Sequence, residues 1–429
     1  MTEAFRTPTL ADFERAREIV QRVTQPTPLE SSRYLAEVLG VPKVYLKCEN
    51  LQRTGAYKLR GAYNRLTQLS EAERAAGVVA ASAGNHAQGV AFAARELGIR
   101  ATIFMPRGVA LPKLQATRNY GAEVVLEGDD FDACSAAAQA FVQATNGTFI
   151  APFDDDAVIA GQGTVALEML DVAPDIETLV VPIGGGGLIS GVAVAAKLRA
   201  QAEGRPMRVI GVQAENAAPY PPSLAAGHPV TIKTRSTIAD GIAVARPGER
   251  NFALIRDFVD EVVTVSDDDI ARAILVLLER AKLVVEPAGA AGVAAMITGK
   301  IKATGVTATI LSGGNIDPLL LQRVIGHGLA ASDRYMKLRI SLPDRPGQLA
   351  RTAELVSAAN ANVVEVLHTR HGTGLPISDG ELALHVDTPR RDAQRSIDDE
   401  RDEQEKLHRG QRTPAAARPR EHRQTRHGD

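Results

Sequence analysis

The chain has 429 residues, of which 45% are hydrophobic and 23% are charged. This length predicts two or three domains. The composition is close to the average of globular proteins, which excludes a chain that is disordered throughout. A formal net charge of -2 provides no basic field for nucleic acid, so we expect no nucleic-acid partner. The two cysteines, Cys48 and Cys134, are too few for a disulfide framework or a structural zinc site. The N-terminal segment lacks the apolar core of a signal peptide, so we expect a cytoplasmic protein.

Short apolar runs alternate with helical patterns through most of residues 1–330. The candidate strands are residues 44–47, 78–82, 101–106, 123–128, 178–183, 208–214, 261–266 and 308–313. Most of them are continuous β-branched runs, which are typical of strands buried on both faces of a parallel sheet. Their alternation with helices predicts an α/β fold with parallel-rich sheets flanked by helices.

Residues 179–196 form an uncharged run that is long enough to suggest a membrane span. The run contains Pro182 and four consecutive glycines, which favour a strand, a loop and the start of a helix instead. We therefore expect no membrane partner.

The pattern changes after residue 330. Three strands and one helix are predicted there, namely residues 336–343, 348–360 (the helix), 362–370 and 380–388. Beyond Pro389 the only large aliphatic residues are Ile397 and Leu407, too few to offset the entropy of ordering such a polar segment. The predicted organisation is one domain at 1–330 with a smaller lobe at roughly 55–155, a small α+β unit at 331–388, and a polar, disordered tail at 389–429.

Three glycine-rich loops each follow a candidate strand in the first domain. They are residues 81–89 (ASAGNHAQG), 182–191 (PIGGGGLISG) and 311–317 (LSGGNID). Open α/β sheets bind ligands at the carboxyl ends of their strands, where these loops are expected to meet.

The second loop is predicted to bind phosphate. Four glycines at 184–187 leave the backbone N–H groups unshielded, and the helix expected from Leu188 adds its positive N-terminal end. The alternative is a tight turn that needs positive φ, for which one glycine would suffice. The loop lacks the GK[ST] ending of nucleoside-triphosphate loops and the spacing of a dinucleotide fingerprint.

Lys58 lies where a glycine-containing loop enters a predicted helix, in TGAYKLRGA at 54–62. Among Ala56, Tyr57 and Leu59 its amine is expected to be partly desolvated, which would lower its pKa and make it nucleophilic. Taken alone, Lys58 would be better explained as a surface lysine on a helix, and the three loops are what favour a site.

These four segments resemble the lysine motif, asparagine loop, phosphate loop and ring-nitrogen serine loop of the fold-type II pyridoxal-phosphate enzymes. The resemblance covers residues 5–325, in family order, and is greatest to the threonine ammonia-lyases (threonine dehydratases) of that family. It implies a two-lobed fold, the cofactor pyridoxal 5'-phosphate, a small amino-acid substrate, and a homodimer or homotetramer. It also implies β-elimination of L-threonine to 2-oxobutanoate and ammonia in isoleucine metabolism, with L-serine to pyruvate as a side activity.

The resemblance also assigns roles to residues. Lys58 would hold the cofactor covalently and act as the catalytic base, Asn85 would hydrogen-bond its phenolic oxygen, and Ser312 would contact its ring nitrogen. The phosphate-binding residues would be Gly184, Gly185, Gly186, Gly187 and Leu188. The loop that receives the substrate carboxylate would comprise Ser82, Gly84, Asn85 and His86. For His86 a structural role at a helix start is an equal alternative, and Glu286 would lie near the cofactor ring or simply begin a closely packed helix.

Departures from the family pattern bear on the reaction. Related serine racemases have a serine where this chain has Ala83, and Ala83 has no proton to give. Their acidic metal-binding residues are replaced here by Gln213 and Pro219, and Glu215 is offset, so no divalent metal site is expected. The alternatives that stay open are a serine racemase, a β-replacing synthase of the same fold, and a non-catalytic sensor.

The C-terminal unit resembles an allosteric ACT domain, with the family's DRPG turn at 344–347. That fold has four strands and two helices, whereas three strands and one helix are found here before the polar tail. We therefore expect an incomplete ACT-like unit with weak or absent feedback by isoleucine or valine.

Overall fold

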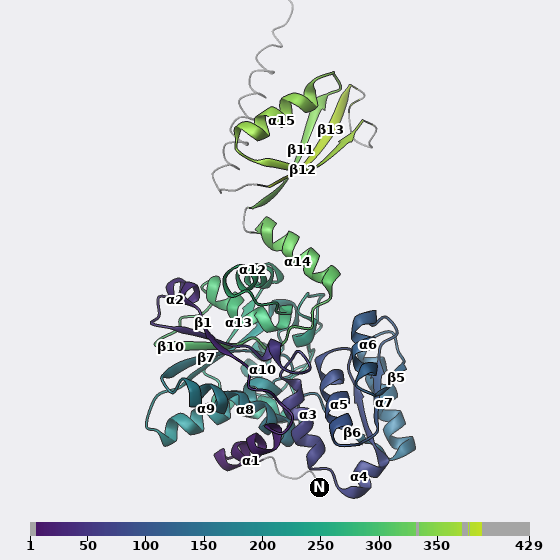
Figure 1. The fold of residues 1–429 in the computed structure, drawn as a ribbon, viewed down its shortest axis with the longest axis vertical. Coiled ribbons are helices and arrows are strands. Elements are labelled where there is room, and N and C mark those ends of the chain that lie inside the picture. Colours follow the sequence, from purple (N-terminus) through teal and green to yellow (C-terminus); the bar gives the residue numbers. More distant parts are fainter. Residues whose placement is uncertain (1–5, 332–333, 371–375, 377, 388–429) are drawn as a thin grey trace, which may run out of the picture. The chain divides into compact units, whose positions relative to one another are not determined.

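A computed structural model describes residues 6–331, 334–370, 376 and 378–387 of the chain (Figure 1). The chain divides into two compact units, the first ending at Gly328 and the second beginning at Leu329. The division falls within the helix α14 (Pro318–Ala331). The tail predicted at 389–429 lies outside the described residues.

The larger sheet of the first unit has six strands in the order β1-β2-β10-β7-β8-β9. They are β1 (Leu29–Ser31), β2 (Val44–Lys47), β7 (Ile176–Pro182), β8 (Arg208–Ala214), β9 (Glu261–Val265) and β10 (Val306–Ile310). Every neighbouring pair is parallel except β1 with β2, so the predicted parallel-rich sheet is confirmed. The antiparallel edge strand β1 was not expected, because three residues with one leucine show no strand pattern.

Helices cover both faces of this sheet. One face packs against α1 (Leu10–Val20), α8 (Asp156–Val172), α9 (Gly187–Ala202) and α11 (Glu249–Phe258). The other packs against α2 (Arg33–Leu39), α12 (Asp267–Val276) and α13 (Pro287–Ile297). In Figure 1 the sheet lies between α8 and α9 on one side and α12 and α13 on the other. The strands are therefore buried on both sides, as their continuous apolar runs predicted.

The smaller sheet has four parallel strands in the order β5-β4-β3-β6. They are β3 (Val78–Ala81), β4 (Ala101–Met105), β5 (Glu123–Leu126) and β6 (Thr148–Phe149). The helices α3 (Lys58–Thr67), α5 (Asn85–Glu96) and α6 (Leu111–Asn119) pack on one face, and α7 (Phe131–Thr145) packs on the other. The remaining elements of the first unit are the helices α4 (Glu71–Ala76) and α10 (Tyr220–Ala226), and the short turns η1 (Glu49–Leu51), η2 (Glu215–Ala217), η3 (Asp240–Ile242) and η4 (Leu277–Ala281).

The described residues of the second unit from Tyr335 onward form three antiparallel strands in the order β11-β13-β12, with one helix. The strands are β11 (Tyr335–Pro343), β12 (Asn362–Thr369) and β13 (Asp379–Asp387), and the helix is α15 (Gln348–Ala358). Its small core contains Leu338, Val356, Leu382, Leu384 and Val386. The predicted strand–helix–strand–strand order is confirmed for the described residues.

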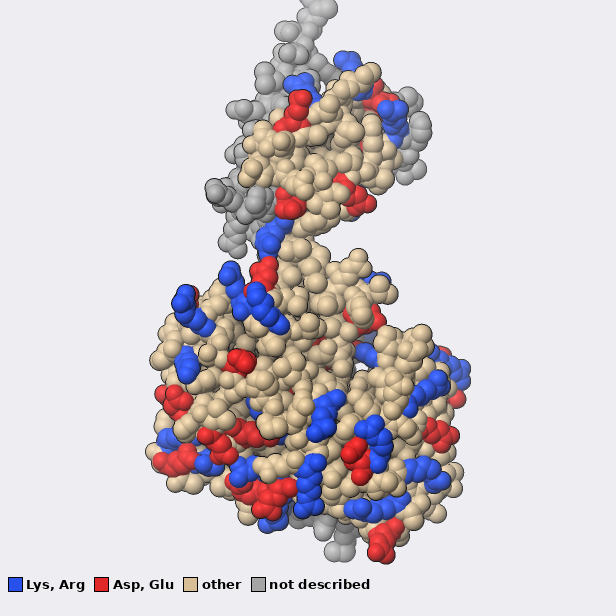
Figure 2. Space-filling view, in the orientation of Figure 1, with Lys and Arg blue, Asp and Glu red and all other residues tan. Residues whose placement is uncertain are grey.

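Charges of both signs are intermixed on the face of the first unit that Figure 2 presents, where Lys and Arg are interspersed with Asp and Glu. Among the described residues, no helix has both the length and the apolar character needed to cross a membrane. The uncharged run at 179–196 is divided between β7, the glycine loop and the start of α9.

The helices α8 and α9 cross so closely that glycine is required on each. A Cβ on Gly191 of α9 would lie 2.3 Å from the carbonyl oxygen of Ile159 and 2.6 Å from the backbone nitrogen of Gly163, both on α8. Since backbone atoms cannot move aside as a flexible side chain does, this crossing fixes the separation of the two helices.

We expect Gly191→Ala to lower the free energy of unfolding by about 1–3 kcal/mol, because the added methyl overpacks the crossing. Intrinsic helix propensity alone would favour alanine by about 1 kcal/mol, so the sign of the change separates the two effects. The control is Gly108→Ala, since a Cβ there would meet no atom within 4 Å. Urea unfolding of both variants measures the change, and a Gly191→Ala protein as stable as the control would contradict the packing argument.

Candidate active site

Lys58 is the first residue of α3 and is held beside the loop that follows β10. The preceding residue, Tyr57, donates its backbone N–H to the carbonyl oxygen of Ser312 at 3.1 Å. Ala56 forms an isolated antiparallel bridge with Gly313. The lysine segment and the serine loop, which lie some 250 residues apart in the sequence, are thus joined through their backbones.

The Lys58 side chain is half-buried, and its amine contacts the segment that follows β6. Its Nζ donates to the carbonyl oxygen of Pro152 at 2.6 Å. Burial lowers the pKa of this amine to about 8, against the opposing influence of the Glu286 carboxylate. At pH 7 about one amine in ten is then neutral, compared with fewer than one in a thousand for an ordinary lysine. Lys58 can therefore act as a nucleophile or a base near neutral pH.

The four-glycine loop joins β7 to α9 and presents only backbone to its surroundings. A Cβ on Gly185 would meet the ring of Phe153 at 2.3 Å, and one on Gly186, whose φ is +108°, would meet the Tyr220 hydroxyl at 2.2 Å. Tyr220 Oη donates to the carbonyl oxygen of Gly185 at 3.0 Å, and this hydrogen bond holds Tyr220 against the loop. The glycines are therefore required by close packing as well as by any ligand.

Phe153 packs against this loop, and the preceding residue, Pro152, accepts the hydrogen bond from the Lys58 amine. The loop therefore lies beside Lys58. The N–H groups of the first turn of α9, which includes Gly187 and Leu188, form the positive end of a 16-residue helix. A phosphate fits such a helix end, and an aldehyde fits the amine of Lys58. The residues present thus fit pyridoxal phosphate, and Lys58 and the loop at 184–188 would be its two points of attachment.

Asn85 and Glu286 form a polar cluster with Asn315 on the other side of the site. Asn85 Nδ2 donates to Glu286 Oε1 at 2.6 Å, and Asn315 Nδ2 donates to Asn85 Oδ1 at 2.8 Å. The backbone N–H of Glu286 donates to the carbonyl oxygen of Gly313 at 3.0 Å, next to Ser312. Asn85 retains a second N–H on Nδ2 for a ligand.

Glu286 is buried, and burial raises the pKa of its carboxyl to about 7, with the nearby Asp240 adding to the shift. Sequence reasoning left the role of this residue open. Its signal was one acidic residue in the otherwise apolar VVEPAGAAG segment, and the structure places it in contact with Asn85 and within reach of the charge on Lys58. Pro152 and Phe153, which also line the site, carried no sequence signal.

The asparagine loop comes from the carboxyl end of β3. Ser82 and Gly84 lie in the turn before α5, where Ser82 Oγ accepts the backbone N–H of Gly84 at 3.2 Å. His86 is buried, and its Nε2 donates to the carbonyl oxygen of Ile150 at 2.9 Å. Burial, together with the positive charge of Lys58, lowers the pKa of His86 to about 3, so the ring is neutral. This bond gives His86 a structural partner, and its contact with a substrate carboxylate stays a prediction.

Comparison with known proteins agrees with this geometry. The sequence family described as pyridoxal-phosphate dependent enzyme matches residues 20–313, a span that includes Lys58, the first two loops and the start of the third. The chain belongs to this family, and its cofactor is pyridoxal phosphate.

Individual relatives narrow the comparison. The L-threonine ammonia-lyase of Thermotoga maritima is 47% identical over 381 residues, which cover 89% of this chain and 94% of the relative. The solved structure of threonine deaminase isoform 2 from Solanum lycopersicum has a TM-score of 0.69 and 38% identity, and covers 74% of this chain and 93% of its own. The solved structure of maize serine racemase has a TM-score of 0.70 and 34% identity, and the match covers 76% of this chain and 99% of the racemase chain.

The lowered pKa of Lys58 predicts its chemical reactivity in the cofactor-free protein. We expect trinitrobenzenesulfonate to modify Lys58 with a midpoint near pH 8, because the reagent attacks the neutral amine. Glu286→Gln should move the midpoint lower, since it removes the negative charge that opposes the shift. Peptide mass spectrometry follows the modification of Lys58 alone. A midpoint above about 10, where ordinary lysines titrate, would contradict the description of the site.

Proposed function

We propose that the chain is a pyridoxal-phosphate-dependent threonine ammonia-lyase that converts L-threonine to 2-oxobutanoate and ammonia. The observation that carries this proposal is the placement of a lysine amine of lowered pKa beside the four-glycine loop, with Asn85 and the Ser312 loop around it. The Thermotoga maritima relative named for this activity matches 381 residues of the chain, more than the 328 residues of the first unit, so the match extends into the second. L-Serine, which lacks one methyl group, would be a side substrate.

The chain's own groups have distinct tasks in this reaction. The bound cofactor supplies the electron sink that makes the α-proton of the amino acid acidic. Lys58 Nζ, with its pKa near 8, takes that proton as general base. Asn85, fixed on one side by Glu286 and on the other by Asn315, offers its remaining N–H toward the ligand. Glu286, with its pKa near 7, can hold or release a proton close to both.

A serine racemase is the second candidate, since maize serine racemase shares the fold at 34% identity. Racemisation needs a proton donor on the face of the substrate opposite Lys58. Position 83, in the loop between β3 and α5, is alanine, and this residue has no proton to give. Ala83 therefore favours elimination over racemisation. The non-catalytic sensor is less well supported, because Lys58, Asn85 and Ser312 are all present at the site.

For the second unit we propose an incomplete ACT-like domain that gives weak or absent feedback. Its order of one strand, one helix and two strands is that of the beginning of such a domain, and β12 exposes Val364, Val366 and Leu367. A role in isoleucine biosynthesis, a cytoplasmic location and a homo-oligomeric state remain part of this proposal.

The direct test is the formation of 2-oxobutanoate from L-threonine by the purified protein. We expect Lys58→Ala to lower kcat by at least about 10²–10⁴-fold, because it removes both the anchor of the cofactor and the general base. Lys197→Ala is the control, since Lys197 lies on the outer surface of α9 in an ion pair with Asp260. A coupled keto-acid assay measures both. Turnover of threonine by Lys58→Ala at the rate of the control would refute the assignment.

Ala83→Ser tests the choice between elimination and racemisation. A serine at 83 supplies a hydroxyl proton, so we expect the ratio of D-serine to pyruvate formed from L-serine to rise above that of the unchanged chain. Ala83→Gly is the matched control, because it alters the same residue without adding a donor. Chiral chromatography of the products gives the ratio. Formation of D-serine by the unchanged chain at a rate that rivals pyruvate would contradict the proposed reaction.

A further inference from the structure

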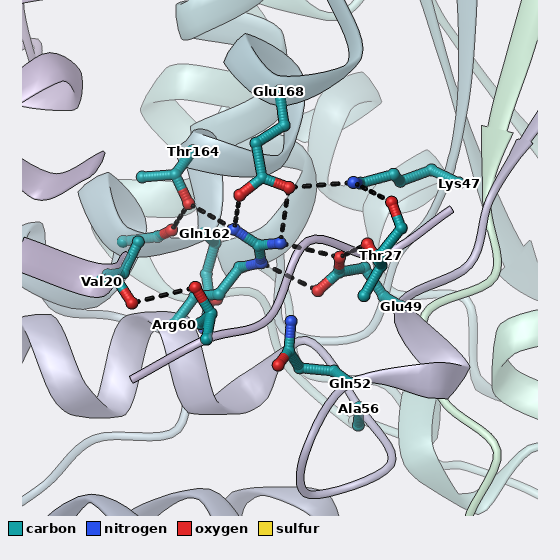
Figure 3. A network of polar contacts seen from close by, with 12 residues as sticks. Val20, Thr27, Lys47, Glu49, Gln52, Ala56, Arg60, Gln162, Thr164 and Glu168 are labelled. Carbon is teal, nitrogen blue, oxygen red and sulfur yellow. Dashed lines mark hydrogen bonds and ion pairs between the residues drawn. The ribbon is translucent and has the colours of Figure 1, made fainter. Parts of the chain in front are cut away.

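Arg60, two residues after the site lysine, is itself fully buried and lies in an ionic cluster (Figure 3). Its Nε and one terminal nitrogen donate to the two carboxylate oxygens of Glu49, both at 2.8 Å. Its terminal nitrogens also donate to the two oxygens of Glu168, at 2.6 and 2.8 Å, and to Thr164 Oγ1 at 3.1 Å. These five hydrogen bonds use all five N–H donors of the guanidinium.

A second cation completes the cluster. Lys47 Nζ donates to Glu168 at 2.9 Å and to the carbonyl oxygen of Thr27 at 2.9 Å, and Thr27 Oγ1 donates to Glu49 at 2.5 Å. Two positive and two negative side chains therefore balance. Burial would raise the pKa of the Glu168 carboxyl, yet hydrogen bonds and charge from Arg60 and Lys47 outweigh it and hold that pKa below its usual value.

The cluster joins three parts of the first unit to the helix that carries Lys58. Lys47 ends β2, Glu49 begins η1, and Glu168 and Thr164 lie on α8. Residues two apart on an α-helix point about 200° apart, so Arg60 and Lys58 leave α3 on opposite sides. One side of α3 is held by the cluster while the other delivers the amine to Pro152.

We propose that Arg60 is a positioning residue for Lys58, which fixes the rotation of α3 about its axis through the paired carboxylates of Glu49 and Glu168. With a helix radius of about 5–6 Å including side chains, a rotation of about 10° moves a side-chain tip by about 1 Å. A misplacement of about 1 Å at a reacting group costs about 10²-fold in rate. The reaction at the site therefore requires that α3 be fixed against rotation about its axis, in addition to any need of the fold.

Stability alone does not explain such a cluster. Buried ion pairs contribute little net stability over apolar residues of similar volume, because the charges must be desolvated. The backbone packing of α3 is independently tight: a Cβ on Gly161 of α8 would meet the Arg60 carbonyl oxygen at 2.7 Å, and one on Gly89 of α5 would meet the Lys58 carbonyl carbon at 3.1 Å. What the cluster adds is orientation, since a planar guanidinium with two bidentate partners accepts only one geometry.

Arg60→Lys is the test, because lysine keeps the positive charge but cannot reproduce the two-sided fork. The matched control is Arg65→Gln, which removes an ion pair between the same helix α3 and Asp155, the residue that caps α8. That pair is partly exposed and lies two helical turns beyond Lys58. Two quantities are measured well below the melting temperature: the rate at which the cofactor-free chain captures pyridoxal phosphate, and kcat and KM for threonine. The kinetic constants for threonine can be interpreted only if the proposed function is correct. The rate of cofactor capture can be interpreted for any member of the pyridoxal-phosphate family.

We expect Arg60→Lys to remain folded, to capture the cofactor about tenfold more slowly, and to lose about 10²-fold in kcat with KM changed less than about threefold. Arg65→Gln should stay within about twofold of the unchanged chain in all three quantities. If Arg60→Lys does not fold, Glu168→Gln takes its place, since the Glu168 side chain is 20% exposed. We then expect slower capture and lower kcat, each by at least about threefold.

The proposal is overturned if a folded Arg60→Lys protein captures the cofactor and turns over threonine within about threefold of the unchanged chain. It is also overturned if Arg65→Gln shows the same losses, since the effect would then be general loosening of two helices. A third outcome separates the two proposals. If the unchanged chain captures the cofactor normally but does not turn over threonine, the proposed function is refuted. If Arg60→Lys also captures the cofactor slowly, the positioning role is still supported.

Discussion

The guanidinium of Arg60 and the two carboxylates that surround it link the elements on which the site depends. A charge with no exposure to solvent needs partners of opposite sign in good geometry, because its desolvation is otherwise unfavourable by several kcal/mol. Glu49 and Glu168 supply that geometry from η1 and α8, and Lys47 balances the second carboxylate from the end of β2. None of these elements can shift without loosening the others. Because α3 begins at Lys58, the position of the site amine follows from the same set of contacts.

Burial acts in opposite directions on the two titratable groups nearest the proposed reaction. It disfavours the charged form of each, so the pKa of Lys58 falls to about 8 and that of Glu286 rises to about 7. The two values approach each other and lie near neutral pH, where proton transfer between a base and an acid is most efficient. Burial also keeps the ring of His86 neutral, and the ring donates a hydrogen bond to the backbone carbonyl oxygen of Ile150. The same low-dielectric environment thus gives Lys58 the pKa of a base, lets Glu286 hold or release a proton, and keeps His86 neutral.

The fold class could be predicted from the sequence because it depends on local signals, and the same kind of signal predicts that Lys58 and the three loops lie together. Continuous β-branched runs identify buried parallel strands, and glycines at the ends of strands mark where a ligand or a backbone comes close. The ion cluster could not be predicted, since Lys47, Glu49 and Glu168 belong to segments up to 121 residues apart and each alone resembles a surface charge. The same holds for Phe153 and Tyr220, which require the glycines at 185 and 186 through contacts that only the folded chain creates.

The central claim is that Lys58 is the residue to which the cofactor attaches. Reduction of the loaded protein with borohydride would make that attachment permanent, and tryptic peptide mass spectrometry would then locate the phosphopyridoxyl group. The account predicts this group on Lys58, in a peptide that also contains Ala56 and Tyr57. Attachment to Lys47, Lys113 or any other lysine, with Lys58 unmodified, would contradict it.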